Sequence, residues 1–242
     1  MPAEPASKDV TLTVTSTLLS MINEHLSPVQ IDAVKKRLLR RIDEYKKLRN
    51  GDWQKAVLAF QQLVDFEIDY QSQKHPDMAS KISCKKSCTY CCEQSVRVTE
   101  DEIAVILSFL LDKDIEIDFT LLREQAQWSK GEWLTKPREK RRCTMLGEDG
   151  QCRIYAFRPM SCRKAISIDD PEKCSKDNDE NPEMFVVPES EIVASAAMSA
   201  QESGSLAKLL YASVIEVMRS EAEPTASRSK EPAPMSPELS LD

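Results

Sequence analysis

Eight cysteines against two histidines are the feature that most constrains this chain of 242 residues, and four of those cysteines fall within nine consecutive positions. This first group has the spacing Cys84-x3-Cys88-x2-Cys91-Cys92. Thiolates three or four residues apart in a loop or a first helical turn can converge on one ion. Soft sulfur ligands select zinc, Cu(I) or iron–sulfur clusters, so the spacing predicts metal binding and leaves the metal open.

A second group of cysteines lies further along the chain and is less dense. It contains Cys143, Cys152 and Cys162, and Cys174 follows in an acidic polar loop, separated from Cys162 by eleven residues. One tetrahedral zinc site or one [4Fe–4S] cluster uses four sulfurs, so eight thiols allow two four-ligand sites or one site with spare thiols. We predict that all eight cysteines are metal ligands, with Cys174 the one that spacing supports least.

The two histidines are not expected to be ligands. His25 and His75 lie far from both cysteine groups and lack the spacing of a mixed Cys/His site. Disulfides and incidental thiols are the two alternatives for the cysteines. Against disulfides, the chain starts without a basic and apolar leader, and neighbouring residues such as Cys91 and Cys92 seldom satisfy disulfide geometry. We therefore expect a cytoplasmic protein with reduced thiols.

Charge is distributed unevenly around the second group. The chain has a net charge of -7, yet residues 136–164 carry nine Lys and Arg against three acidic residues, a net +6. Cations near thiols lower their pKa and offset the charge of a multi-thiolate site. The other interpretation is a basic face for nucleic acid or an acidic partner. The overlap with the cysteines favours support of the metal site, so no nucleic acid partner is expected.

Outside the cysteines, the chain has the apolar periodicity of helices. Capping boxes at Ser27–Gln30 and Thr99–Glu102 precede such patterns, and no long alternating strand pattern occurs. The sequence predicts a mainly α fold: a helical hairpin, a cysteine-rich metal-binding domain with irregular loops, and C-terminal helices. The expected units are a flexible N-terminus at 1–20, the helical hairpin at 21–83, the cysteine-cluster metal-binding domain at 84–175, the C-terminal helices at 176–222 and a disordered tail at 223–242.

Helix expectations within these units are more specific. The hairpin is placed at about 27–73, one further helix at 100–112, a weaker helical pattern at 119–134, and two C-terminal helices at 189–201 and 204–220. None of these segments shows a catalytic constellation, so we interpret them as scaffold and core. No apolar run is long enough to span a membrane, and no glycine-rich phosphate loop occurs.

The two cysteine motifs together resemble a known family. The first, Cys84 to Cys92, is followed by Val96-Arg-Val-Thr-Glu100, and the second runs from Cys143 through Gly150-Gln-Cys152-Arg-Ile-Tyr155 to Arg158-Pro159-Met-Ser-Cys162-Arg163. This pattern is similar to the YkgJ-type cysteine-cluster family of zinc- or iron-chelating domains, with its C…GxCxIYxxRPxxCR signature. The resemblance covers about 84–175. It implies a metal- or cluster-binding domain and supplies no substrate.

Three residues of the second motif are candidates for tuning the site. Arg158 and Arg163 could donate hydrogen bonds to sulfur or to backbone carbonyls, while Tyr155 packs beneath the site. The alternative is that they only fix local structure. Gly150 suits a turn that needs positive φ.

The sequence leaves several functions open. The first is a protein that holds an iron–sulfur cluster or zinc for electron transfer, sensing or metal handling, with a metal ion or cluster as its ligand and a protein partner allowed. The second is a cluster-dependent enzyme acting on a protein or small substrate, and the third is a zinc-stabilised interaction module. A minor enzyme variant comes from Cys84-x3-Cys88-x2-Cys91, which also looks like the motif of radical S-adenosylmethionine enzymes.

Overall fold

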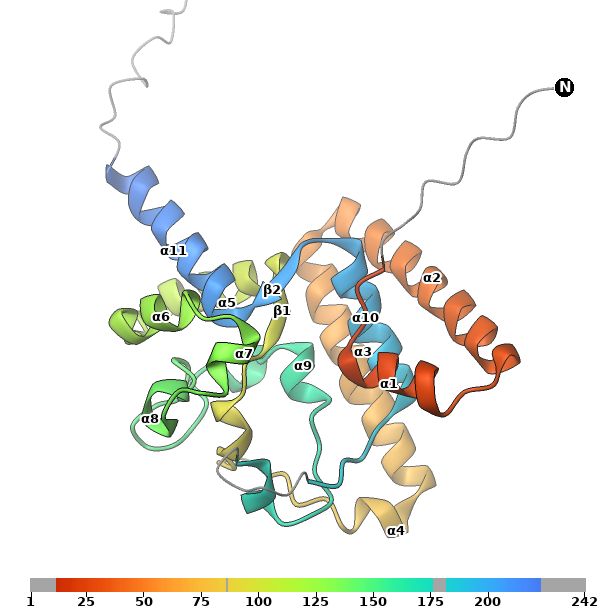
Figure 1. Ribbon diagram of the computed structural model, residues 1–242. Helices are drawn as coiled ribbons and strands as arrows, with labels where there is room; N and C mark the ends of the chain where they lie inside the picture. The colour runs from red at the N-terminus through yellow and green to blue at the C-terminus, as the bar shows by residue number, and fades with distance from the viewer. Residues whose placement is uncertain (1–11, 86, 176–181, 223–242) are drawn as a thin grey trace, which may run out of the picture.

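The structure is a computed structural model that describes residues 12–85, 87–175 and 182–222, and the described chain is mainly α-helical, as predicted (Figure 1). The predicted flexible terminus and disordered tail therefore fall largely on residues 1–11 and 223–242, which lie outside the described residues. The elements are α1 (Ser16–Glu24), α2 (Pro28–Gly51), α3 (Trp53–Lys74), α4 (Pro76–Ala79), η1 (Tyr90–Glu93), β1 (Arg97–Thr99), α5 (Glu100–Asp112), α6 (Phe119–Ala126), α7 (Lys130–Trp133), α8 (Arg138–Arg141), η2 (Tyr155–Phe157), α9 (Met160–Arg163), η3 (Pro171–Cys174), α10 (Pro188–Ala200), β2 (Ser203–Ser205) and α11 (Leu206–Ala222).

Both predicted capping boxes form and set the starts of helices. At the start of α2, the Ser27 backbone N–H donates to Gln30 Oε1 at 2.9 Å, and at the start of α5 the Thr99 backbone N–H donates to Glu102 Oε2 at 3.0 Å. Each bond satisfies a polar group that the first helical turn leaves without a partner. The hairpin of α2 and α3 and the helix α5 consequently begin where the sequence indicates.

The stretch 119–134 forms two short helices where the sequence suggested one weak pattern. A third capping box explains the break, because the Ser129 backbone N–H donates to Glu132 Oε2 at 2.8 Å and starts α7 as a separate helix. Trp133 at the end of α7 then donates its indole N–H to the backbone oxygen of Glu93 at 2.8 Å. Helix α7 therefore fixes Glu93, the residue that directly follows the first cysteine motif.

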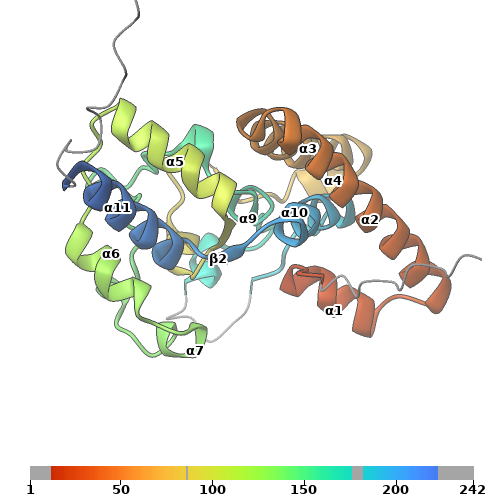
Figure 2. The same ribbon diagram turned by 90° about the horizontal axis from the view of Figure 1, so that it is seen from above.

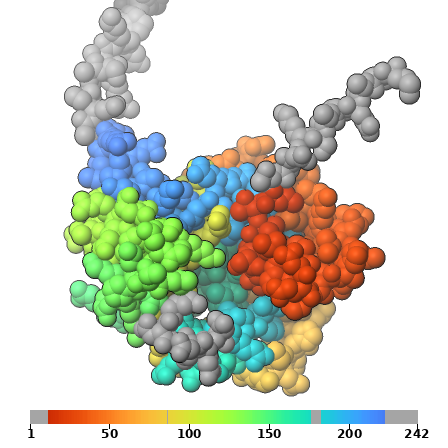
Figure 3. Space-filling model, viewed as in Figure 1, coloured from red at the N-terminus to blue at the C-terminus, as the bar shows by residue number. Residues whose placement is uncertain are grey.

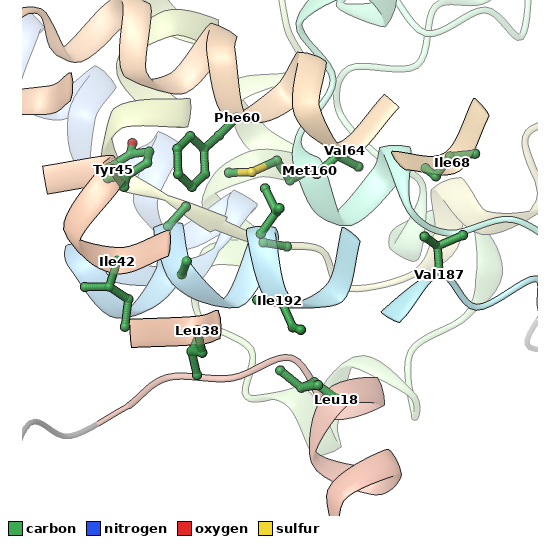
Figure 4. Packing of buried hydrophobic residues seen from close by; sticks show 14 of the residues in the cluster. Leu18, Leu38, Ile42, Tyr45, Phe60, Val64, Ile68, Met160, Val187 and Ile192 are labelled. Atoms are coloured by element: carbon green, nitrogen blue, oxygen red, sulfur yellow. The ribbon is translucent and has the colours of Figure 1, made fainter. Parts of the chain in front are cut away.

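A first hydrophobic core lies among α1, α2, α3 and α10 (Figure 4). Tyr45 of α2 meets Phe60 of α3 edge to face, with ring centroids 4.8 Å apart. Helix α10 is buried on nearly all sides, which its run of alanines and serines allows because small side chains let helices approach closely. Leu18 of α1 is fully buried in this core, so the described part of the expected flexible N-terminus is packed instead.

A second hydrophobic core lies among α5, α6 and α11, beside the first (Figure 2). The two C-terminal helices are therefore divided: α10 belongs to the first core and α11 to the second. The short antiparallel pair of β1 and β2 connects them, with Val98 opposite Gly204. The second cysteine motif passes from one core to the other, because Ile154 is buried in the second core and Met160 in the first.

Within the described ranges, no helix combines the length and the apolar character that a bilayer span requires.

Candidate metal centre

The first cysteine motif is a pair of tight turns followed by the single turn η1. Ser87 has φ +74°, in the left-handed region, and reverses the chain between Cys84 and Cys88. The backbone N–H of Cys88 donates to Lys85 O at 3.0 Å, and that of Cys92 donates to Thr89 O at 2.9 Å. These turns keep the thiols close in space as well as in sequence.

Backbone contacts bring the second motif against the first. The N–H of Cys143 donates to the carbonyl oxygen of Cys92 at 2.8 Å. Cys152 pairs with Leu146 in an isolated antiparallel bridge, and the intervening turn contains Gly150 at φ +72°, the positive value expected for it. Cys143 and Cys152 are thereby held at one short hairpin beside η1.

Cys84 and Cys174 meet at Ser167. The backbone N–H of Ser167 donates to Cys84 Sγ at 3.1 Å. Burial raises the pKa of Cys174 above its ordinary value, and a hydrogen bond with the Ser167 hydroxyl opposes that rise. Gln94 also donates its side-chain N–H to Cys174 O at 3.2 Å, which ties the last cysteine to the first motif.

Four thiols line one open cavity of about 520 Å³. They are contributed by Cys84, Cys88, Cys91 and Cys162, and the opposite wall is the face of α3 that carries Asp65 and Asp69. A small cavity of about 30 Å³ lies beside it and is lined by Cys88, Cys92 and Cys152. The hairpin helix α3 is therefore a wall of the cysteine site as well as a core element.

Cys91 affects the pKa of five other cysteines through its charge. Burial is the largest cause that raises the pKa of the thiols around it, and the charge of Cys91 raises the pKa further at each of them. This effect reaches Cys84, Cys143, Cys152, Cys162 and Cys174. Cys91 itself is the exception, because a hydrogen bond with the thiol of Cys92 lowers its pKa and raises that of Cys92.

In the residues that the structure describes, the thiols lie near one another without meeting at one point. Across the described ranges, no three Cys, His, Asp or Glu side chains already stand in an arrangement that could hold a metal ion. All eight cysteines are free thiols. The donor set nevertheless fits a soft metal, because four thiols line one cavity and backbone N–H groups of Ser167, Met145 and Ile154 hydrogen-bond to Cys84, Cys143 and Cys152.

The arginines of the second motif differ in what they contact. Arg163 donates to the carboxylate of Asp65 on α3, and its Nε donates to the backbone oxygen of Arg158 at 2.8 Å. Arg158 lies with its guanidinium carbon 4.4 Å from the ring centroid of Tyr155, and its charge opposes the burial effect on the pKa of Cys84 and Cys152. Arg158 thus favours the thiolate form of both cysteines.

Most of the positive charge at 136–164 is engaged within the chain. Arg138 pairs with Glu93 at 2.5 Å, Lys140 with Glu124 at 2.7 Å, and Lys164 with Glu191 at 2.9 Å. Arg163 pairs with Asp65, and the remaining contacts go to backbone oxygens and aromatic rings, from Lys136, Arg142, Arg153 and Arg158. These contacts favour the interpretation that the basic stretch supports the fold around the thiols.

Two residues important to the site carry no sequence signal for that role. Buried Glu102 caps α5, as its capping box predicts, but its second carboxylate oxygen accepts the backbone N–H of Met160 at 2.7 Å. It thereby fixes the start of α9, which carries Cys162. Glu93, directly after Cys92, is buried and held by Trp133 and Arg138. Both roles depend on partners more than 35 residues away, which local spacing does not reveal.

The histidines lie away from these contacts. The His25 side chain is 69% exposed beside Glu24, and neither His25 nor His75 lines the two cavities described above.

Comparison with protein families finds one similarity, and it covers the cysteine motifs. Residues 83–184 match the model of the family described as "CxxCxxCC: Putative zinc- or iron-chelating domain". The segment 83–184 is similar to the domains of this family. The resemblance inferred from the two motifs is confirmed, and the family description gives zinc or iron as the metal of the cysteine-cluster domain. Neither the curated proteins nor the solved structures gave a match.

Proposed function

We propose that this chain is a cytoplasmic metal protein whose clustered cysteines hold an iron–sulfur cluster or zinc for electron transfer, sensing or metal handling. The observation that carries the proposal is that four thiols line one cavity, within a segment that matches a zinc- or iron-chelating family. The proposed ligands are Cys84, Cys88, Cys91, Cys92, Cys143, Cys152, Cys162 and Cys174.

The surroundings of the thiols support a charged sulfur site. A four-thiolate site carries excess negative charge, and Arg158 supplies a nearby cation. Backbone N–H groups directed at sulfur stabilise thiolates and orient them. Tyr155, Arg158 and Arg163 are proposed to hold these groups in place, Arg163 by its bonds to Asp65 and to backbone oxygens.

Access to the thiols favours a working centre over a purely structural one. Structural zinc sites are closed by four protein ligands, whereas catalytic sites keep a position open. Here Cys84 and Cys91 are exposed, and Cys91 and Cys162 line an open cavity. This exposure supports a centre that exchanges electrons or metal with a partner. A zinc-stabilised interaction module is the weaker alternative.

A cluster-dependent enzyme is the second candidate, because a cavity reaches the thiols. Its radical S-adenosylmethionine variant gains no support from the fold. In the ranges that the structure describes, the sheet consists of β1 and β2 alone, and this pair is antiparallel. A β/α barrel needs consecutive parallel strands.

Metal analysis of anaerobically purified protein tests the proposal. We expect iron or zinc bound to the full-length chain. An iron–sulfur centre will show visible absorption that a reductant bleaches, whereas a zinc site will be colourless. Protein that contains neither metal and takes up neither under reducing conditions would contradict the proposed function.

Metal binding is expected to release protons and to strengthen as pH rises. Burial raises the pKa of Cys143 to about 11 and that of Cys162 well above its ordinary value. Both thiols are therefore protonated at neutral pH in metal-free protein, whereas a metal binds thiolates. Zinc affinity should increase from neutral pH toward about pH 11. Competition titrations with a chromophoric chelator on each side of neutrality will measure this, and a pH-independent affinity would contradict it.

A further inference from the structure

A second large cavity approaches the cysteine centre from another side. It has a volume of about 600 Å³ and lies between α1 and α7, where the space-filling view shows a hollow between the two helices (Figure 3). Cavities of this size are typical of small-molecule sites. At its inner end it reaches Cys91 and Cys162, the two cysteines that also line the first cavity.

The charge of this cavity is of one sign. Three basic residues line it, namely Arg97, Lys130 and Lys164, and no acidic residue does. Lys164 is already paired, at 2.9 Å, with the buried carboxylate of Glu191. In the part of the chain that the structure describes, Arg97 and Lys130 form no ion pair with a carboxylate. Arg97 is instead oriented by Ser203 Oγ at 3.2 Å.

The remaining walls are apolar or carry hydroxyl groups. Val14 and Leu19 from the α1 segment, Met198 of α10 and Trp128 form an apolar surface. Ser16, Ser161 and Thr15 add hydroxyl groups, and Thr15 is fixed because its hydroxyl donates to Glu191 at 2.5 Å. An apolar surface with a few placed polar groups is the usual composition of a ligand site.

We propose that this cavity binds a small organic anion. Its carboxylate or phosphate group contacts Arg97 and Lys130, and its apolar body lies against Trp128 and the α1 wall. The far end of the ligand then faces Cys91 and Cys162. Anion binding in this cavity goes beyond the proposed function. A role for the ligand at the metal centre rests on that proposed function.

Calorimetric titration of full-length, metal-loaded protein tests this inference. The probes are benzoate and phenyl phosphate as anions, and benzylamine as a cation of the same ring. We expect an anion to bind and benzylamine not to bind. The variants Lys130→Glu and Arg97→Gln should each weaken anion binding by roughly tenfold, the equivalent of 1.4 kcal/mol. Lys35→Glu, the same charge change on the outer helix α2, should leave binding unchanged.

The outcomes separate this inference from the proposed function. Binding of benzylamine as tightly as the anions, equal anion affinity in Lys130→Glu and wild type, or no binding of either anion would overturn the anion site. Benzoate and phenyl phosphate distinguish a carboxylate site from a phosphate site. Metal content is measured in the same samples, because wild-type protein that holds neither iron nor zinc identifies a failure of the proposed function, whereas anion binding tests the cavity.

Discussion

Replacing Cys162 with serine is expected to remove most of the bound metal and to lower the unfolding temperature of the cysteine-cluster domain. Cys162 lies where the two large cavities meet, and its pKa is raised by burial and by the charges of Cys143 and Cys91. A serine hydroxyl is a poor ligand for a soft metal. Metal binding is also folding free energy, on the order of 10 kcal/mol for a structural zinc site. Metal analysis and thermal unfolding will measure both effects.

A small series of variants makes this result specific. Cys88→Ser should behave like Cys162→Ser, because Cys88 lines the cavity of about 520 Å³ and the small one of about 30 Å³ beside it. His25→Ala should retain wild-type metal, since His25 is exposed and lies outside those cavities. Cys174→Ser decides whether the last cysteine is a ligand or only a neighbour. Full metal content in both Cys88→Ser and Cys162→Ser would refute the ligand set.

Removing the carboxylate of Glu102 is expected to destabilise the protein by about 3 kcal/mol, because two buried backbone N–H groups lose their partner. Those groups belong to Thr99, at 3.0 Å, and Met160, at 2.7 Å. The change Glu102→Ala also leaves a gap where a fully buried side chain stood. Urea unfolding of the metal-loaded protein will give the free energy difference.

Two further variants test whether this loss is due to the carboxylate. Glu102→Gln keeps one acceptor oxygen and should recover part of the stability. Glu100→Ala changes an exposed glutamate in the first turn of the same helix, and its effect should be small. If Glu100→Ala and Glu102→Ala cost the same, the bond to Met160 contributes nothing.

Local signals explain which parts of the fold the sequence predicts. The starts of α2 and α5 follow from capping boxes, in which both partners lie within three residues of each other. The break before α7 has the same kind of cause, a box at Ser129 and Glu132, but the weak apolar pattern across it suggests one helix. The division of α10 and α11 between two cores depends on contacts with distant helices, which periodicity alone does not specify.

The candidate site divides in the same way. Spacing identifies the cysteines, because chelation requires sulfurs close together in the chain or in a matching second motif. Spacing does not identify Asp65 and Asp69, which line the same cavity as the thiols only because α3 packs there. Ser167 is also hidden, since its contacts with Cys84 and Cys174 use a backbone N–H and a hydroxyl that no motif distinguishes.

The position of α10 in the first core has a consequence for biosynthesis. A growing chain carries all eight cysteines once Cys174 has been added. At that stage it still lacks Glu191 of α10. The Glu191 carboxylate accepts hydrogen bonds from Lys164, which is two positions after Cys162, and from Thr15 of the N-terminal segment. The thiols are thus synthesised before the surroundings that position them. Stable metal insertion is accordingly expected after α10 has been synthesised and packed.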